Sequence, residues 1–452
     1  MSTHVAAREE MWDEAVDAAP WEGTRARQRQ ALGPWLTGLS QRTGLYAGRL
    51  RGLQVPADPS EQWLADLPFT TKADLRHAQE QASDDRPLGD LQGVRTEDLV
   101  QVIASSGTTG TPMFFGLTGD DLAAWRNTIA NVYWTAGVRR SSTVALTTGM
   151  TMVAGGLPYA DGIRETGATL AWVGGQTPGR MVTIVDALKV DVLVGTASFS
   201  TFFSRQVEAS LGRPASELGI QTIIGGGEPG LGTPEIRERV RETWGAQRIS
   251  EIMGIGDVLS GMWSECAQGE GMHFVAAPHV LVELIDPETG ALVPWEPGAT
   301  GEAVYTTIGR QASPVLRYRS RDHMLVTGVE CSCGRMSPTV RCVGRTDDML
   351  IYKAMNVFPS AIRDVLLNRF PDRLTGSMRI RKERTDQVRF DDPIPLELEF
   401  ADAGATHVAA LVADMEEHIR QELRVRVAIE ALTPGTIVLG NYKNTMTYVK
   451  ND

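Results

Sequence analysis

The sequence predicts an α/β protein with a large N-terminal domain that contains parallel sheets and helices and a smaller α+β C-terminal domain. Three observations support this fold class. Short apolar runs alternate with helical segments from about residue 143 to 224, strand-rich sequence follows from about residue 273, and a compact module begins after residue 348. Strands that alternate with helices indicate parallel pairing. A chain of 452 residues also exceeds one ordinary hydrophobic core, so two domains are expected.

Residues 1 to about 90 carry helical patterning and predict a helical layer at the start of the chain. The stretch from Arg25 to Leu39 places apolar residues among arginines and glutamines, and Gly33-Pro34 within it is expected to interrupt or restart a helix. Farther along, Thr118 is a suitable helix N-cap because Asp121 follows three residues later. A helix is therefore expected from there through Trp125.

The expected strands fall into three groups. Those of the parallel sheet are Thr143 to Leu146, Thr169 to Val173, Val190 to Val194 and Gln221 to Ile224. The run Val280 to Ile285, followed by a turn at residues 286–290, predicts a β-rich subdomain over about residues 273–343. The C-terminal module should contain strands near Met378 to Arg381 and Pro395 to Phe400, and a helix near Val408 to Leu423.

Composition and charge narrow the class of protein. The chain is 42% hydrophobic and 22% charged, as is typical of soluble globular proteins. Its net charge of −12 disfavours a nucleic-acid-binding protein, which would need a basic surface. The N-terminus lacks a secretory signal pattern, and no apolar stretch approaches the ~20 residues that a membrane span needs. We therefore expect a cytoplasmic protein with neither nucleic acid nor membrane as a partner.

The segment Ser105-Ser106-Gly107-Thr108-Thr109-Gly110 is the strongest functional signal, and it follows an apolar run, Leu99 to Ala104, that predicts a strand. Glycines allow a tight turn with outward N–H groups, and hydroxyls add donors for phosphate oxygens. Such a loop suits a polyphosphate, although a surface turn without function can have a similar composition. It is not a Walker A motif, because no Lys-Ser or Lys-Thr follows the second glycine.

Four more segments follow this loop in order: Gly225-Gly226-Gly227-Glu228-Pro229, Tyr318-Arg319-Ser320-Arg321-Asp322, residues 344–351 beginning Gly-Arg-Thr-Asp-Asp, and Asn356-Val357-Phe358-Pro359. Together these segments resemble the adenylate-forming superfamily of acyl-CoA synthetases, luciferases and peptide-synthetase adenylation domains. Within it they look most like the phenylacetate–CoA ligase family. The resemblance runs from about residue 95 to the C-terminus. It implies an adenylation domain over residues 1–345 and a mobile C-terminal domain over residues 346–452, with Asp347 at the hinge.

The resemblance implies that ATP activates a small carboxylic acid to an acyl-adenylate with release of pyrophosphate, with Mg²⁺ as the metal. The acyl group would then pass to the thiol of coenzyme A. Because an acid oxygen must attack the α-phosphate, the protein has to neutralise charge and hold two anions in position. The loop at residues 105–110 would hold the β- and γ-phosphates. Related families often place a lysine after the proline of this loop, where this chain has Met113.

Two segments are implied to contact the nucleotide base. Gly226-Gly227-Glu228-Pro229 matches the segment that lines adenine, since small residues permit close backbone approach to a flat ring; a glycine-rich strand end without function has the same pattern. Met253-Gly254-Ile255-Gly256-Asp257 stands where the family usually has Tyr-Gly-x-Ser/Thr-Glu. Asp257 keeps the hard oxygen ligand that Mg²⁺ prefers. Met253 replaces the aromatic residue that stacks on adenine.

Charged residues complete the implied site. Asp322 matches the aspartate that accepts hydrogen bonds from the ribose hydroxyls, and Arg345 matches an arginine near the ribose and phosphate. An exposed salt-bridge network is the alternative explanation for this charged segment. Lys443 matches the lysine that bridges the substrate carboxylate and the α-phosphate. Tail lysines are usually solvated, and Lys450 lies nearby, but position in the sequence favours Lys443.

The four cysteines form a second constellation together with a histidine. Cys266 precedes His273, and Cys331 and Cys333 are separated by one residue. Thiols clustered with a histidine suggest structural zinc, which takes four Cys or His ligands in a tetrahedron. A similar pattern occurs in phenylacetate–CoA ligase relatives, which favours Cys266, His273, Cys331 and Cys333 as ligands and leaves Cys342 as a spare. Core thiols without metal are the alternative.

The acid pocket is expected between the sheet and the helix at residues 120–137. Its candidate residues are aromatic and favour an aromatic acid: Tyr133, Trp134, Tyr159, Phe199 and Phe202. The segment at residues 147–152 is poorer in aromatic residues than its counterpart in phenylacetate ligases, so the acid need not be phenylacetate.

Two other functions stay open. Ala354 stands where the ligases usually carry a glycine that lets the pantetheine tunnel form, so the acceptor could instead be a carrier-protein phosphopantetheine or an amine. The third hypothesis is that the protein is a nucleotide-binding regulator without catalytic activity. The retention of Asp322, Arg345 and Lys443 argues against it. The sequence leaves the oligomeric state open, with a homodimer as one option.

Overall fold

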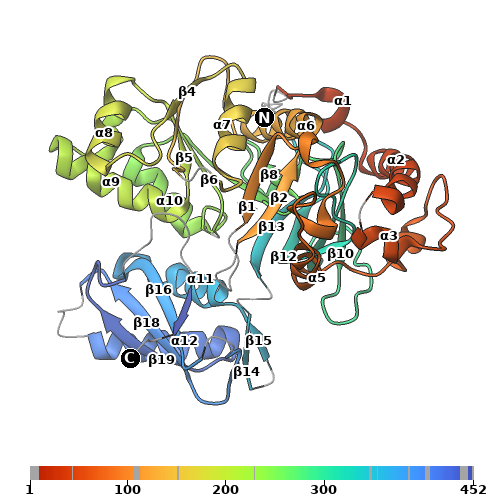
Figure 1. The fold of residues 1–452 in the computed structure, drawn as a ribbon. Coiled ribbons are helices and arrows are strands. Elements are labelled where there is room, and N and C mark those ends of the chain that lie inside the picture. The colour runs from red at the N-terminus through yellow and green to blue at the C-terminus, as the bar shows by residue number, and fades with distance from the viewer. Residues whose placement is uncertain are drawn as a thin grey trace, which may run out of the picture.

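The computed structural model describes residues 10–42, 44–105, 112–149, 152–228, 230–345, 349–353, 355–384, 387–402, 408–437 and 446–449. Within these residues a large α/β part ends at Arg345, and a smaller α+β part begins at Leu350 and lies below it in Figure 1. The predicted fold class is confirmed. None of the helices in the described ranges is long and apolar enough to cross a membrane.

The chain begins with the expected helical layer. Its members are α1 (Glu14–Asp17), α2 (Trp21–Arg42), α3 (Gly44–Leu50), α4 (Glu61–Ala65) and α5 (Lys72–Glu80), followed by the 3₁₀ turns η1 (Gly89–Leu91) and η2 (Thr96–Asp98). The predicted interruption at Gly33-Pro34 is wrong, because α2 continues through Pro34. A Cβ at Gly33 would lie 2.3 Å from the carbonyl oxygen of Ala57, so the glycine permits close packing of a neighbouring segment. Burial of Leu32 and Leu36 outweighs the one helical hydrogen bond that the proline removes.

An 11-stranded sheet with the order β10-β11-β12-β13-β9-β8-β7-β6-β5-β3-β4 forms the centre of the large part. All four predicted parallel strands are present and pair in parallel with one another or with β7. They are β3 (Thr143–Leu146), β4 (Thr169–Trp172), β5 (Val192–Gly195) and β6 (Thr222–Gly225), joined by β7 (Arg248–Ile255). The helical elements between and beside them are α7 (Leu157–Glu165), α8 (Pro178–Ala187), α9 (Ala197–Leu211), η3 (Ala215–Leu218) and α10 (Pro234–Trp244).

The β-rich half continues the same sheet. Its strands are β8 (Leu259–Glu265), β9 (Met272–Phe274), β10 (Val280–Ile285), β11 (Thr300–Thr307), β12 (Tyr318–Gly328) and β13 (Thr339–Arg345). Antiparallel pairing begins at β8, earlier than the expected residue 273, because β7 turns directly back into β8. The turn between these two strands carries Asp257 and therefore lies where the parallel and antiparallel halves meet.

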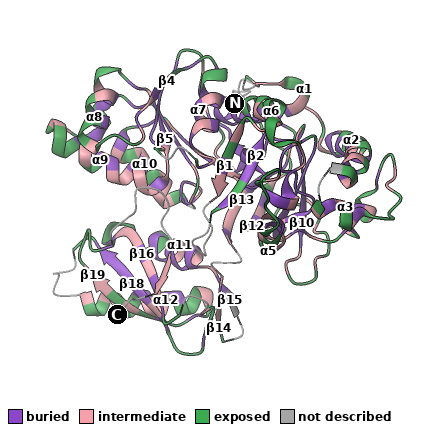
Figure 2. Cartoon of the chain, in the orientation of Figure 1, coloured by how far each residue is buried: buried purple, intermediate pink, exposed green. Residues whose placement is uncertain are grey.

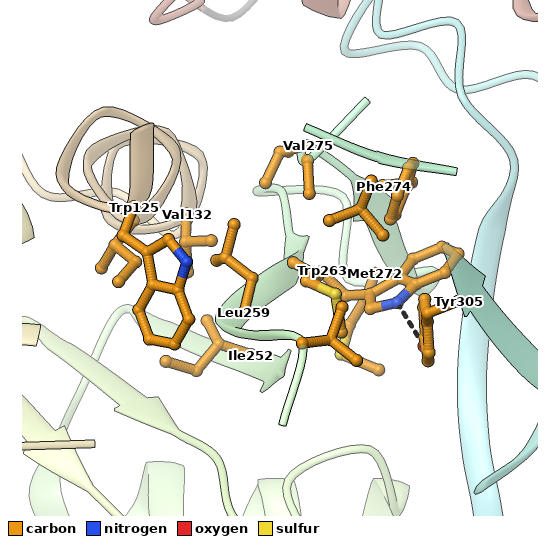
Figure 3. Close-up of a cluster of buried hydrophobic side chains, with 14 of the residues drawn as sticks. Trp125, Val132, Ile252, Leu259, Trp263, Met272, Phe274, Val275 and Tyr305 are labelled. Atoms are coloured by element: carbon orange, nitrogen blue, oxygen red, sulfur yellow. Dashed lines mark hydrogen bonds between the residues drawn. The ribbon is translucent and has the colours of Figure 1, made fainter. Parts of the chain in front are cut away.

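A hairpin of β1 (Gln101–Ser105) and β2 (Met113–Leu117) stands in front of this sheet and flanks the expected phosphate loop. It leads into α6 (Gly119–Thr135), which starts with the predicted capping box of Thr118 and Asp121. Trp125 and Val132 on α6 face Ile252 and Leu259 on the sheet, as Figure 3 shows. In the same core the indole of Trp263 donates a hydrogen bond of 3.0 Å to the hydroxyl of Tyr305.

The C-terminal part has its own buried core (Figure 2). Its elements are β14 (Leu350–Tyr352), β15 (Met355–Val357), α11 (Pro359–Arg369), η4 (Pro371–Arg373), β16 (Leu374–Lys382), β17 (Arg389–Phe390), β18 (Ile394–Phe400), α12 (Val408–Leu423), β19 (Val427–Leu432) and β20 (Thr447–Val449). The two strands and the helix expected from the sequence correspond to β16, β18 and α12. The main sheet of this part has the order β19-β18-β16-β20.

Candidate active site

Asp257 is the centre of a buried polar cluster in the turn between β7 and β8. Its carboxylate is almost inaccessible and receives hydrogen bonds from Lys72 Nζ at 2.8 and 2.7 Å and from the hydroxyl of Tyr318 at 2.5 Å. Arg310 fixes the backbone of the turn by donating to the carbonyl oxygens of Asp257 and Val258 at 2.8 and 2.7 Å. Burial lowers the pKa of Arg310 to about 10, so the guanidinium stays charged at neutral pH.

Lys72 joins this cluster to the start of the expected phosphate loop. Its ammonium group also donates to the hydroxyl of Ser105 at 2.8 Å. Lys72 is the first residue of α5, whose N-terminus is held by a capping box between Thr71 and Asp74. The other loop residues assigned to phosphate binding, Ser106, Gly107, Thr108, Thr109 and Gly110, lie outside the described residues.

Lys72 was not among the candidates drawn from the sequence. A lysine behind a Thr-x-x-Asp capping box is an ordinary feature of helix starts, and nothing local sets it apart. Its partners are 33 and 185 residues away along the chain, so only the tertiary fold reveals the cluster. The sequence contains only an indirect indication of such a lysine. Met113 stands where related families often have a cation, so another residue would have to supply one.

The predicted ribose-binding residue Asp322 lies on β12 beside Arg345 on β13. These two residues are direct cross-strand partners, and Arg345 NH1 donates to Asp322 Oδ1 at 2.8 Å. Asp322 is buried, whereas the Arg345 side chain is 30% exposed. Asp322 lies within a register shift between β11 and β12 that also contains Arg321 at a φ of 64°, and such bulges re-aim the side chains in and next to them.

The two segments expected to hold adenine lie side by side, because β6 and β7 are neighbouring parallel strands. A Cβ at Gly226 would lie 2.5 Å from the carbonyl oxygen of Ile252, and one at Gly254 would lie 2.1 Å from the backbone of Ser260. Gly227 has a φ of 84°, which favours glycine. Both segments therefore require glycine to pack backbone against backbone.

The remaining residues of these segments differ in what they contact. Glu228 accepts a hydrogen bond of 2.6 Å from the backbone N–H of Ser198, near the start of α9. Met253 is half-buried against the main core. Pro229 lies outside the described residues.

The aromatic residues assigned to the acid pocket form two pairs and one outlier. Tyr133 and Tyr159 meet edge to face with ring centroids 5.8 Å apart, and Phe199 and Phe202 are 6.1 Å apart. Trp134 instead contacts the ring of Trp12 at 5.4 Å and the guanidinium of Arg139 at 4.6 Å, which places it against the N-terminal segment.

Tyr159 and Phe199 each lie near one of the nucleotide segments. The Tyr159 hydroxyl donates to the carbonyl oxygen of Ser260 on β8, at 2.9 Å, close to the Asp257 turn. Phe199 follows Ser198, which is bonded to Glu228. Tyr133 is completely buried behind Tyr159, and burial raises the pKa of its hydroxyl well above 10.

The predicted zinc ligands come together. The ligand atoms of Cys266, His273, Cys331 and Cys333 all lie within 4.8 Å of one another. The Cys266 and Cys331 sulfurs are 3.7 Å apart, and Cys333 Sγ is 3.5 Å from His273 Nε2. A tetrahedron with Zn–S bonds of ~2.3 Å has edges of ~3.8 Å, so these separations suit a metal ion at the centre.

The groups of the cluster share their protons. Hydrogen bonds from Cys266 and Cys331 lower the pKa of the Cys333 thiol, whereas the contacts with Cys331 and Cys333 raise the pKa of Cys266. Zinc binding would require the thiolate forms. His273 Nδ1 lies 3.3 Å from the carbonyl oxygen of Ser337, which can fix the tautomer that presents Nε2 to the cluster. Cys342 contacts the Gly344 carbonyl oxygen instead, at 3.6 Å, in keeping with its expected role as the spare cysteine.

Two residues of the expected mechanism, Lys443 and Asp347, lie outside the described residues. The segment that carries Asp347 connects β13 to β14, so the described parts on either side of it are adjacent in the chain. Ser360 at the start of α11 donates to the Val343 carbonyl oxygen at 2.8 Å.

Sequence comparison with known proteins identifies one family and related ligases. The pattern of the family described as AMP-binding enzyme matches residues 47–309. The phenylacetate–coenzyme A ligase of Thermus thermophilus is 31% identical over 364 residues, which cover 79% of this chain and 78% of that protein. The ligase of the same name from Pseudomonas putida is 28% identical over 392 residues and covers 86% of this chain and 84% of that protein.

The fold is that of solved structures of 2-hydroxyisobutyryl-CoA ligase. The structure of that enzyme in its post-adenylation state has a TM-score of 0.87 at 23% identity and covers 98% of this chain and 93% of that chain. Its structure with 2-HIB-AMP and CoA in the thioesterification state has a TM-score of 0.70 at 24% identity with the same coverage.

Proposed function

Because the chain belongs to the AMP-binding enzyme family of AMP-forming acyl-CoA ligases, we propose that it activates a small aromatic carboxylic acid with ATP and transfers the acyl group to coenzyme A. The observation that carries this proposal is the convergence of Asp257 and Ser105 through Lys72, beside the glycine segments expected to bind adenine. A polar cluster at the meeting point of the two halves of the sheet is where charged phosphates and a divalent cation would be held.

In this proposal each residue acts on the nucleotide through its charge or shape. Asp257 would bind Mg²⁺, which screens the phosphate charge, since carboxylate oxygens are its preferred ligands. Asp322 would accept hydrogen bonds from the ribose hydroxyls, with Arg345 holding the carboxylate in place. The backbone at Gly227, where an added Cβ would meet only Thr196 at 4.0 Å, would approach the adenine ring. The glycine-rich loop would donate N–H and O–H groups to the β- and γ-phosphates.

Adenylation requires positive charge at the α-phosphate while the acid oxygen attacks it. Lys443 is proposed to supply that charge by bridging the two anions. Tyr159 and Phe199 are proposed to line the acid pocket, with Phe202 beside Phe199 and Tyr133 supporting Tyr159 from behind. Aromatic rings at these positions would favour a flat, aromatic acid over an extended aliphatic chain, with the Tyr159 ring held by its hydrogen bond to Ser260.

We also propose a structural zinc ion at Cys266, His273, Cys331 and Cys333. All four positions of a tetrahedron would be taken by protein ligands, which is typical of structural sites and leaves no place for a substrate.

A carboxylate-dependent ATP–pyrophosphate exchange screen tests this function. Aromatic acids such as benzoates and phenylacetates should support exchange, whereas short aliphatic acids should not. Coenzyme A, a phosphopantetheinylated carrier protein and simple amines are then added separately with the best acid. Thioester formation with coenzyme A supports the proposal, and transfer only to a carrier protein or an amine would favour the alternative acceptor, as Ala354 suggests. ATP binding without exchange for any acid would refute adenylation.

A further inference from the structure

We propose that Lys72 is a phosphate-binding residue that supplies the cation missing from the glycine-rich loop. The inference rests on the proposed function and adds a residue that no comparison assigns. When the nucleotide binds, the Lys72 ammonium group contacts the β- or γ-phosphate beside Ser105, while Asp257 is taken over by the divalent cation.

The geometry places one ammonium group between the two partners that ATP would use. Lys72 Nζ lies within 2.8 Å of both carboxylate oxygens of Asp257 and of the hydroxyl of Ser105. Asp257 is the proposed metal ligand, and Ser105 is the first residue of the proposed phosphate loop. Lys72 therefore stands in for the metal as the partner of Asp257 until the nucleotide arrives, and it already touches the loop that holds the phosphates.

The local charges indicate which way Lys72 moves. A divalent cation at Asp257 would repel the ammonium group at that distance, so the remaining contact at Ser105 becomes its anchor. A magnesium–ATP complex carries a net charge of about −2 on its phosphates, and Lys72 places an ammonium group at Ser105, where the expected phosphate loop begins. Arg310 is bound to backbone oxygens below the turn and is held there by the rings of Phe115 and Trp125.

The loop itself offers no substitute. Met113, at the position where a lysine often stands in related families, is buried in the core at the start of β2. By contrast the Lys72 side chain is 26% exposed, whereas that of Asp257 is 4% exposed, so Lys72 faces the open side of the site.

The position of Lys72 at the start of a helix also argues for a role in binding. A cation at a helix N-terminus opposes the helix dipole and is unfavourable there. The helix start is nevertheless well anchored, because the capping box is complete and Arg49 NH2 pairs with Asp74 at 2.7 Å. The helix start therefore fixes the backbone of Lys72, while its flexible four-carbon side chain allows the ammonium group to move from Asp257 to a phosphate.

The test compares the binding of two nucleotides to one variant. The Kd values of ATP with Mg²⁺, of ATP with excess EDTA and of AMP are measured by calorimetry for the unmodified chain, Lys72→Met and the control Lys189→Met. Lys189 is a matched control because it is exposed and pairs with Asp186 at the surface. We expect Lys72→Met to weaken ATP about 10- to 100-fold, as for loss of one charged hydrogen bond, and to leave AMP within about twofold.

A merely structural role predicts a different pattern. If Lys72 only held the metal ligand Asp257 in place, Lys72→Met would weaken ATP in the presence of Mg²⁺ but not ATP measured with excess EDTA, and the inference would be wrong. A phosphate contact by Lys72 itself predicts a similar loss of ATP affinity with and without Mg²⁺. Lys72→Gln serves if the methionine variant does not fold, because it keeps polar contacts and removes only the charge. Lys72→Arg should restore part of the lost ATP affinity. Failure of the unmodified chain to bind ATP at all would refute the proposed function itself, and with it this inference.

Discussion

Asp257 and Asp322 are both buried carboxylates, but their partners differ in a way that suits their proposed ligands. Asp257 is paired with the ammonium group of Lys72 and the hydroxyl of Tyr318. Asp322 is paired with the planar guanidinium of Arg345 across two strands. Burying a carboxylate without a partner is costly, so each needs one in the unliganded protein. A lysine partner can be replaced by a metal ion, whereas an arginine partner on a neighbouring strand fixes a carboxylate for hydrogen bonding.

At the residue scale, we predict that Lys443→Ala abolishes adenylation and leaves ATP binding nearly intact. Loss of one electrostatic contact at the reacting phosphate should cost roughly 3 kcal/mol in the transition state, or about a hundredfold in rate. ATP–pyrophosphate exchange with the best acid and the Kd of ATP are the two measurements. Lys450→Ala is the matched control and should behave as the unmodified chain. Exchange close to normal in Lys443→Ala would remove this lysine from the mechanism.

The residues that the sequence could predict are those inside recognisable motifs. Asp257 and Asp322 lie in such motifs, and the structure pairs Asp322 with the predicted Arg345. Lys72 could not be found in this way, because its role depends on contacts between distant segments. Trp134, by contrast, was assigned to the acid pocket from the sequence but lies elsewhere in the structure. Its residue type suited an acid pocket, but the orientation of α6 turns its ring towards Trp12, and local sequence does not encode that orientation.

At the element scale, the cluster of Cys266, His273, Cys331 and Cys333 ties together the end of β8, the strand β9 and the loop between β12 and β13. β9 pairs with both β8 and β13, so these ligands lie on segments that are already adjacent. β13 ends at Arg345. A metal ion bound by these four residues would stabilise this strand, which is the last element of the large part before the C-terminal part.

We predict about one zinc ion per chain, bound tightly and with a structural role. Elemental analysis of protein purified without chelator should show it, and removal by a strong chelator should lower the melting temperature. Cys331→Ser should lose the metal and be less stable, whereas Cys342→Ser should keep it, since Cys342 lies outside the cluster. Metal-free protein with an unchanged melting temperature would show that these are core thiols only.

The elements themselves were largely predictable because their signals are local. Each of the four predicted parallel strands is an apolar run between helices. The N-cap of α6 is formed by residues within one four-residue segment that begins at Thr118. The prediction that Gly33-Pro34 interrupts a helix was wrong because this glycine serves tertiary packing. It allows the backbone of Ala57 to approach α2, and it does not form a turn. The early start of antiparallel pairing was missed because no strand was predicted over residues 248–265, where β7 and β8 pair across the turn that carries Asp257.

At the scale of the whole molecule, the two parts meet at α10 and at the end of the large sheet. At α10, Arg239 NH1 and NH2 donate to the carbonyl oxygens of Thr375 and Pro371, both at 2.8 Å, and Thr233 lies 3.3 Å from Asp364.

At the sheet, Ser360 donates to the Val343 carbonyl oxygen, and the centroid of the Phe358 ring lies 5.1 Å from that of the His323 ring. These are mostly polar contacts, with apolar contributions from Ile236 and Phe358. An interface of this kind can open without unfolding either part.

We therefore predict that Asp347→Pro separates the two half-reactions. Proline fixes φ near −65°, so a hinge residue that must change its backbone conformation would be held in one state. If the arrangement described here is the one that forms the adenylate, the variant should keep ATP–pyrophosphate exchange and lose acyl transfer to coenzyme A. The rates of ATP–pyrophosphate exchange and of acyl transfer to coenzyme A are measured with the same acid.

The control for Asp347→Pro is Asp347→Ala, which keeps backbone freedom and should retain both half-reactions. The melting temperature of the proline variant must match that of the unmodified chain, so that a loss of transfer reflects the hinge and not the fold. The contacts of Arg239 give an internal check, because weakening them by Arg239→Ala in the proline background should not restore transfer if the block lies at the hinge. A well-folded Asp347→Pro variant with both half-reactions at normal rates would mean that rotation about this residue is not part of the catalytic cycle.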